Sequence, residues 1–174
     1  MRNQLSSFFV LVFGFSGALA EPPATKELTE TEFNKELSNL LANPTQRDAD
    51  VIAKKIVMFM MGNKHAVVIL GPEELKWGFN DEKYGKILFA AFVGGNTQSQ
   101  LYSGVHGNDR YSGLISLFKA YRQLKANDSD FTVKEIETLL ALHKEGKMMQ
   151  YLIELEKKQP TDLLGKHPLG TIKK

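Results

Sequence analysis

Apolar residues recur every three or four positions along most of the chain, and this spacing constrains the fold more than any other feature of the sequence. In the first clear case, Phe33, Leu37, Leu40 and Leu41 follow Thr29 at helical intervals. Residues at these intervals lie on one face of an α-helix, and that face is buried when helices pack together. The pattern predicts an all-α fold, a compact orthogonal or irregular bundle of about six helices.

Short polar motifs and glycines mark the predicted helix ends. Thr29 with Glu32, and later Thr132 with Glu135, fit the capping box, in which a side chain at each position binds the backbone amide of the other. Gly62 is expected to end its helix in the left-handed conformation, which glycine adopts without steric cost, and Gly146 is expected to end the helix that follows Thr132. The predicted single helical domain spans residues 29–159.

Residues 65–70, His-Ala-Val-Val-Ile-Leu, form an apolar run too short to identify from its spacing alone. It fits either one short strand or a short helical turn. No second segment nearby is an obvious strand partner, and a lone strand leaves its backbone hydrogen bonds unmade. The sequence therefore favours a short helix here, with a short strand as the alternative.

The first twenty residues are typical of a secretory signal peptide. Arg2 precedes the apolar run 8–15, and residues 16–20 are mostly small and end in Ala-Leu-Ala. A membrane-spanning helix needs about 20 apolar residues, and Gly14 interrupts this shorter run. We expect export with cleavage after residue 20, no stable membrane insertion afterwards, and a periplasmic or secreted product.

Two flanking segments are expected to lie outside the helical domain. Residues 21–28 contain Pro22 and Pro23, which lack a backbone donor and favour an extended leader. Residues 160–174 contain prolines, glycines and terminal lysines, a composition typical of a flexible tail.

Charge and cysteine content exclude several classes of protein. The chain has 22 basic and 20 acidic residues, a net charge of +2, and no cysteine. An exported protein without disulfides depends on an ordinary apolar core. Nucleic-acid binding is disfavoured because it requires clustered basic side chains.

The common catalytic signatures are missing from the sequence. It contains no G-x-S-x-G elbow, no phosphate-binding glycine loop, no H-E-x-x-H helix and no cysteine nucleophile. The histidines are scattered over different predicted elements, so no metal site is predicted, and nothing implies a cofactor. The sequence favours a binding protein over an enzyme.

The stretch YSGVHGNDRYSG, residues 102–113, combines turn-forming residues with polar side chains. Its candidate site residues are Tyr102, His106, Asn108, Asp109, Arg110 and Tyr111. As a site, His106 would act as a base or ligand, Asp109 would orient it, and Arg110 would hold an anion. A lone His-x-x-Asp pattern is weak support for such chemistry.

A turn explains the same twelve residues more simply, and we favour it. Gly104 and Gly107 permit positive φ, and Asn108 or Asp109 suits the N-cap of the following helix. In this interpretation His106 and Arg110 are solvated, and Tyr111 holds the turn against the core.

Three aromatic residues near one short connection are candidates for partner binding. Trp77, Phe79 and Tyr84 either cover the core or anchor a protein partner, because Trp and Tyr are enriched at interface hot spots.

Two further patterns have a packing interpretation and a functional one. Gly94 and Gly95 either let another helix approach closely or break their helix to expose backbone to a ligand, and we favour close packing. Met58, Met60 and Met61 are interpreted as core residues, with a pliable cavity for a ligand as the alternative.

The sequence therefore predicts an exported soluble helical protein that binds another macromolecule in the cell envelope, as an inhibitor or accessory factor. The first alternative is an envelope enzyme with a site at His106 and Asp109. The second is a carrier of a small apolar ligand around Met58–Met61.

Overall fold

The computed structural model describes residues 28–71 and 83–157, and all regular secondary structure within them is helical. This confirms the predicted all-α bundle. The described helices are α1 (Glu30–Ala42), α2 (Ala49–Gly62), α4 (Gly85–Ser103), α5 (Arg110–Asn127), α6 (Lys134–Lys144) and α7 (Met148–Lys157). None of these helices is both long enough and apolar enough to cross a bilayer. The predicted signal peptide, residues 21–27 of the leader and the tail 160–174 lie outside the described residues.

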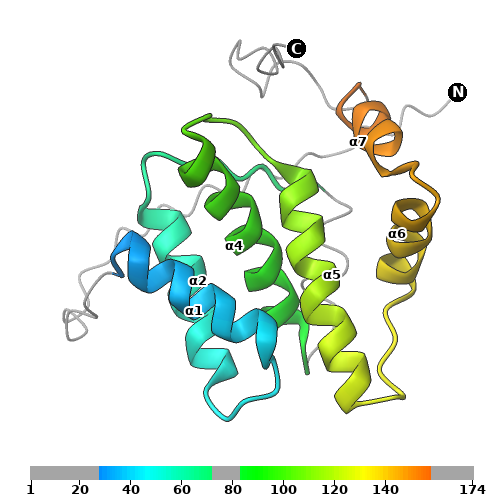
Figure 1. Cartoon of the computed structure of the whole chain (residues 1–174), viewed down its shortest axis with the longest axis horizontal. Coiled ribbons are helices and arrows are strands. Elements are labelled where there is room, and N and C mark those ends of the chain that lie inside the picture. The colour runs from blue at the N-terminus through cyan, green and yellow to red at the C-terminus, as the bar shows by residue number, and fades with distance from the viewer. Residues whose placement is uncertain (1–27, 72–82, 158–174) are drawn as a thin grey trace, which may run out of the picture.

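Helix α4 is the centre of the bundle. It lies between α5 and the pair formed by α1 and α2, while α6 and α7 lie beyond α5 (Figure 1). Buried residues occur along α4 from its first residue to Gln100. A helix surrounded in this way is apolar or small on most of its sides, which accounts for its composition.

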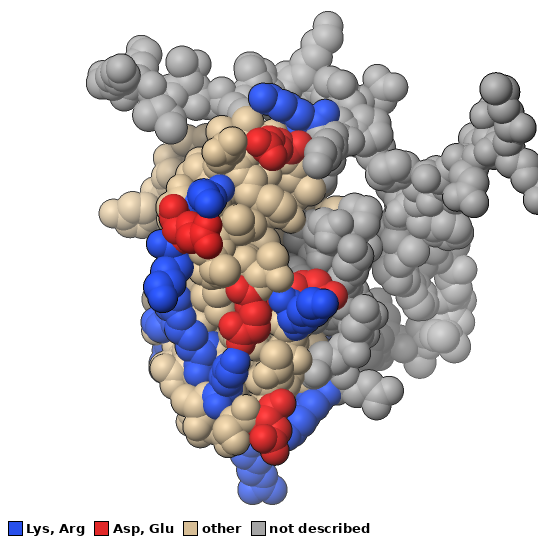
Figure 2. Space-filling model, turned by 90° about the vertical axis from the view of Figure 1, so that its right-hand side faces the viewer, with Lys and Arg blue, Asp and Glu red and all other residues tan. Residues whose placement is uncertain are grey.

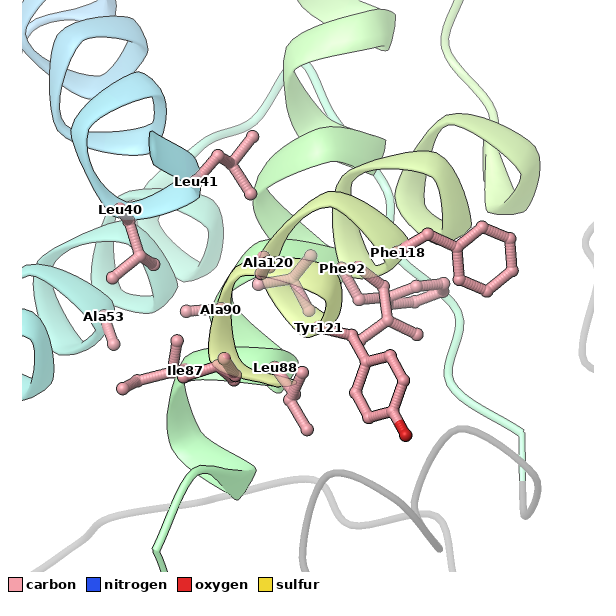
Figure 3. Packing of buried hydrophobic residues seen from close by; sticks show 14 of the residues in the cluster. Leu40, Leu41, Ala53, Ile87, Leu88, Ala90, Phe92, Phe118, Ala120 and Tyr121 are labelled. Carbon is pink, nitrogen blue, oxygen red and sulfur yellow. The ribbon is translucent and has the colours of Figure 1, made fainter. Parts of the chain in front are cut away.

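The apolar core forms where α1, α2, α4 and α5 meet. Figure 3 shows side chains from all four helices, among them Leu40, Ala53, Leu88 and Tyr121. On α1, the Phe33 ring stacks on the ring of Phe59 with centroids 4.3 Å apart. The helical spacing in the sequence therefore identified core-facing residues correctly.

Glycines allow α4 to approach its neighbours more closely than larger residues would. A Cβ atom added at Gly95 would lie 2.5 Å from Ser116 Cβ and 2.8 Å from the Ser112 carbonyl oxygen, both on α5. At the opposing Gly113, an added Cβ would lie 2.9 Å from the Phe92 carbonyl oxygen. The close-packing interpretation is confirmed, and the idea that the glycine pair breaks its helix is wrong, because α4 continues to Ser103.

One predicted capping box is present and the other is not. The Thr29 amide donates to Glu32 Oε2 at 2.8 Å, and the Glu32 amide donates to Thr29 Oγ1 at 3.2 Å. The box at Thr132 is wrong because α6 begins one residue later, with Val133 as its N-cap. Valine has no side-chain acceptor, and the Val133 amide instead donates to the Tyr121 hydroxyl at 3.2 Å.

Both glycines that were predicted to end a helix do so, but the left-handed conformation predicted for Gly62 is wrong. Gly62 is the last residue of α2, but within the described chain only Gly104 and Gly146 have positive φ. Gly146, at φ 71°, ends α6 with the Lys147 amide donating to the Leu142 carbonyl at 2.9 Å. This is the Schellman arrangement, which satisfies carbonyls at a helix end.

Residues 65–70 form neither of the predicted elements. The described structure assigns them no strand and no helix. The short helix favoured from the sequence and the alternative short strand are both wrong, and the cause lies in the hydrogen bonds described in the next subsection.

A polar cluster joins α5 to α6. The Tyr121 hydroxyl donates to Glu137 Oε1 at 2.8 Å, and Lys125 Nζ donates to the same oxygen. The hydrogen bonds from Lys125 and then from Tyr121 hold the pKa of the Glu137 carboxyl below its ordinary range.

The packing of Gly95 predicts a large difference between two glycine substitutions. Gly95→Ala should lower the free energy of unfolding by about 1–3 kcal/mol, because the added methyl overlaps α5. Gly62→Ala should be neutral or stabilising by up to about 1 kcal/mol, since nothing lies within 4 Å of that position. Urea denaturation of both variants measures the difference. Equal effects would show that α4 and α5 are not in close contact at Gly95.

The Glu137 cluster predicts a pH dependence. A carboxyl whose pKa is lower in the folded state stabilises the protein above its unfolded pKa, and this contribution is lost as the pH falls through the folded value. Glu137→Gln should therefore destabilise at pH 7, and its difference from wild type should shrink as the pH falls below about 4. Denaturation midpoints at pH 7 and pH 3 provide the measurement. Glu135→Gln, on the same helix, is the control. A difference in stability between Glu137→Gln and wild type that is as large at pH 3 as at pH 7 would contradict the prediction.

Candidate functional site

The loop between α4 and α5 is a tight turn with an ordered helix end on each side. Gly104, at φ 65°, ends α4 in the left-handed conformation. Asp109 is the N-cap of α5, and its Oδ1 accepts from the Ser112 amide at 3.0 Å. These two residues have the structural tasks that the turn interpretation gave them, whereas Gly107 does not adopt the positive φ that it permits.

Side-chain amides from this region hold residues 65–70 in place. Gln100 Nε2 donates to the Val67 carbonyl at 2.9 Å, and Gln100 Oε1 accepts from the Val67 amide at 2.9 Å. Asn108 pairs in the same way with Ile69, at 3.1 Å from its amide and 3.2 Å from its carbonyl. His106 Nδ1 lies 2.6 Å from the His65 carbonyl oxygen.

These contacts explain why neither a regular strand nor a helix forms here. The hydrogen bonds alternate along the chain, as they do on one edge of a β-strand, but their partners are side chains instead of a second backbone. A lone extended segment can thus complete one edge without a neighbouring strand. Sequence reasoning considered only backbone partners and missed this solution.

Behind these contacts lies a buried polar residue, Asn96, with no exposed surface. Its Nδ2 donates to Asn108 Oδ1 at 2.7 Å, and its Oδ1 accepts from Gln100 Nε2 at 2.6 Å and from the Asp109 amide at 3.0 Å. Buried amides are tolerated when their donors and acceptors are paired. Asn96 therefore fixes the positions of the two amides that hold the extended segment.

The structure does not pair His106 with Asp109. Asp109 Oδ2 accepts from Ser99 Oγ at 2.6 Å and from Ser112 Oγ at 2.7 Å, while His106 is exposed and contacts the His65 carbonyl. A general base needs an orienting partner, and this carboxylate is occupied by two serines. Among the described residues, no three His, Asp or Glu side chains lie close enough to hold a metal ion.

The remaining residues of the loop occupy three different environments. Arg110, the first residue of α5, is 2% exposed, so the prediction that it is solvated is wrong. Tyr111 is half-buried and packs against the core, with its ring centroid 6.1 Å from that of His143. Tyr102 is 93% exposed.

A groove of about 550 Å³ runs along the other side of α4. It is lined by Glu30, Asn34, Gly95, Gln98, Ser99, Tyr102, Tyr111, Ser112, Ile115 and Ser116. These residues come from α1, α4 and α5, and none of them is basic. The glycine that lets α5 approach α4 is part of the lining, so the helix packing and the groove depend on the same residue.

Polar groups in the groove are partly engaged with one another. Gln98 Nε2 donates to Asn34 Oδ1 at 2.7 Å, which leaves the Gln98 carbonyl oxygen and the Asn34 amide nitrogen as further hydrogen-bonding groups. The groove thus combines two tyrosine side chains with amides and hydroxyls. Such a lining binds ligands that have both apolar surface and hydrogen-bonding groups.

The predicted aromatic site is described only at Tyr84, because Trp77 and Phe79 lie outside the described residues. Tyr84 is 9% exposed, and its ring packs edge-on against Phe131 with centroids 4.8 Å apart. The ring of Tyr84 is therefore part of the core surface, where it covers the start of α4.

The methionines of α2 do not form an interior cluster. Met58 and Met61 are 48% and 67% exposed, whereas Met60 is partly buried against the core. The interpretation of all three as core residues is therefore right only for Met60.

Comparison of the chain with protein-family models, with curated proteins and with solved structures found no match.

Sequence analysis recognised the loop but missed the residues that organise it. Asn96 and Gln100 belong to an uncharged polar run, Asn-Thr-Gln-Ser-Gln, that continues a helix whose preceding residues are apolar. The sequence does contain a signal for these residues: amide side chains stand at positions where the apolar face of the helix would continue. A buried amide requires a hydrogen-bonding partner, so this pattern predicts polar contacts with another segment.

Two glutamines on α4 give a matched test of the side-chain contacts. Gln100→Leu should lower the free energy of unfolding by about 2 kcal/mol, since it leaves the Val67 backbone groups unpaired. Gln98→Leu removes one side-chain hydrogen bond and should cost less than about 1 kcal/mol. Denaturation measures both, and amide exchange at Val67 should accelerate only in the first variant. Equal costs would contradict the role assigned to Gln100.

Proposed function

We propose that this chain is an exported protein that binds another macromolecule in the cell envelope and acts as its inhibitor or accessory factor. The observation that carries the proposal is the groove between α1, α4 and α5, in which the lining residue Tyr102 is almost wholly exposed. Export is inferred from residues 1–20 and does not depend on the groove.

The side chains of the groove favour recognition of a protein surface. Tyrosine contributes a large rigid ring and one hydroxyl, and it is enriched at the energetic centres of interfaces. Beside it, Ile115 is 38% exposed and adds apolar surface next to the polar amides. An open surface of this kind suits a segment of a larger partner, whereas small-molecule sites enclose most of their ligand.

The charge distribution on the face drawn in Figure 2 supports the same conclusion. Basic and acidic side chains are interspersed there, without a broad area of one sign. Elsewhere among the described residues, opposite charges also pair directly, Lys83 with Asp128 at 2.7 Å and Lys125 with Glu137. A nucleic-acid partner would be favoured by clustered basic groups, so on this face a protein partner is the better fit.

The two alternatives receive less support. An enzyme at His106 and Asp109 would need a contact between them, but each side chain has other partners. A carrier of an apolar ligand would need the α2 methionines around an enclosed space, but Met58 and Met61 are exposed.

Replacing Tyr102 tests the proposal directly. The tagged chain should retain a specific protein from an envelope fraction, and Tyr102→Ala should weaken binding of that purified protein by about tenfold or more. Because the side chain is exposed, stability should change by less than about 0.5 kcal/mol.

Met149→Ala is the matched control, since it removes an exposed apolar side chain, 54% accessible, from α7, which contributes no residue to the groove. It should bind the partner as the wild type does. Equal binding by all three proteins would show that the groove is not the recognition site.

A further inference from the structure

The extended segment 65–70 has two backbone edges, and only one of them is hydrogen bonded. The backbone groups of alternate residues point toward the end of α4 and the turn that follows it. There His106 lies against the His65 carbonyl, Gln100 binds Val67, and Asn108 binds Ile69. This regular alternation shows that successive residues present their backbone groups to opposite sides, as in a β-strand.

The intervening residues present the second edge. Within the described part of the chain, the backbone amides and carbonyls of Ala66, Val68 and Leu70 make no hydrogen bond. The side chains of Val68 and Leu70 pack against the core, so the segment is held firmly while this edge stays unpaired. Ala66 is buried, and Val68 and Leu70 are only partly exposed.

The backbone donors and acceptors along this edge lack hydrogen-bonding partners. Buried or partly buried backbone groups in native proteins are almost always paired, and each unpaired group costs about 1–3 kcal/mol. Donors and acceptors that recur at every second residue, about 7 Å apart, match the backbone of another extended chain. The backbone groups of a helix are already hydrogen bonded within the helix, so a helix cannot pair with this edge.

We propose that the partly exposed part of this edge, at Val68 and Leu70, binds an extended segment of another protein as an added β-strand. The interaction goes beyond the groove, because it uses backbone groups on the segment that Gln100 holds, whereas the groove is lined by Ser99 and Tyr102. The partner segment has no proline at the paired positions, because proline lacks the donor.

The surroundings of the edge narrow the chemistry of its partner. Val67, 50% exposed, offers apolar surface next to the backbone edge, so the partner segment carries apolar residues at alternate positions. Lys64 is exposed at the start of the segment and makes no ion pair with any described residue. An acidic residue at the corresponding end of the partner strand complements it.

Short random peptides displayed on phage and selected on the purified full chain provide the probe. Calorimetry then compares selected peptides with wild type, Val68→Pro and Val68→Ala. Proline removes one donor from the open edge but leaves the Gln100 and Asn108 contacts, and alanine shortens the side chain while keeping the donor. Binding should weaken about tenfold or more with proline and change little with alanine.

Amide hydrogen exchange on the wild-type protein gives a second measurement that does not depend on folding of the proline variant. Peptide binding should slow exchange at Val68 and Leu70, while Val67 and Ile69, already hydrogen bonded, change little. Tyr102→Ala should leave peptide binding intact, so that failure of the groove and failure of the edge are distinguishable.

Three outcomes would overturn the inference. The selection could yield no binding peptide, or peptides that bind Val68→Pro as tightly as wild type and leave exchange at Val68 and Leu70 unchanged. Concentration-dependent dimerisation that protects the same two amides without peptide would assign the edge to a second copy of this chain instead.

Discussion

The close contact between α4 and α5 is the constraint on which the rest of the structure depends. Gly95 and Gly113 bring the two backbones together at positions where a methyl group would overlap the opposite helix. This approach sets the width of the groove beside Gly95 and brings the end of α4 near the start of α5, so that Asn96 reaches both Asn108 and the Asp109 amide. Local packing of small residues thereby positions both surfaces that we assign to binding.

Much of the helical fold could be predicted from the sequence because helices make their hydrogen bonds internally. The spacing of Phe33 and Leu37, the capping box at Thr29 and the end at Gly146 all depend on neighbours within a few residues. Residues 65–70 were predicted wrongly because their partners, Gln100 and Asn108, lie more than thirty positions away. A local sequence pattern cannot predict a hydrogen bond between residues so far apart in the chain, and a bond made by a side chain is the hardest to predict.

The candidate site was predictable in part for the same reason. The unusual composition of residues 102–113 marked the loop, and Asp109 as a helix cap follows from rules that apply within one turn. The groove combines residues from three helices, and its polar pair joins Asn34 to Gln98, so it is visible only once the helices are packed. The burial of Arg110 likewise depends on tertiary packing, whereas a charged loop residue is ordinarily assigned to solvent.

The adjacency of Asn108 and Asp109 constrains the order of folding events. Asn108 pairs with Ile69, and Asp109 caps α5. Asn108 is therefore in position to bind the extended segment only when the turn between α4 and α5 has formed. Residues 65–70 precede α4 in the chain, yet we expect them to dock after the helical hairpin that follows them. Early contacts in the hairpin are short in sequence separation and fast to close, whereas docking of the segment closes a longer loop at a higher entropic cost. We therefore expect the transition state for folding to be centred on the α4–α5 hairpin, with the segment ordered later.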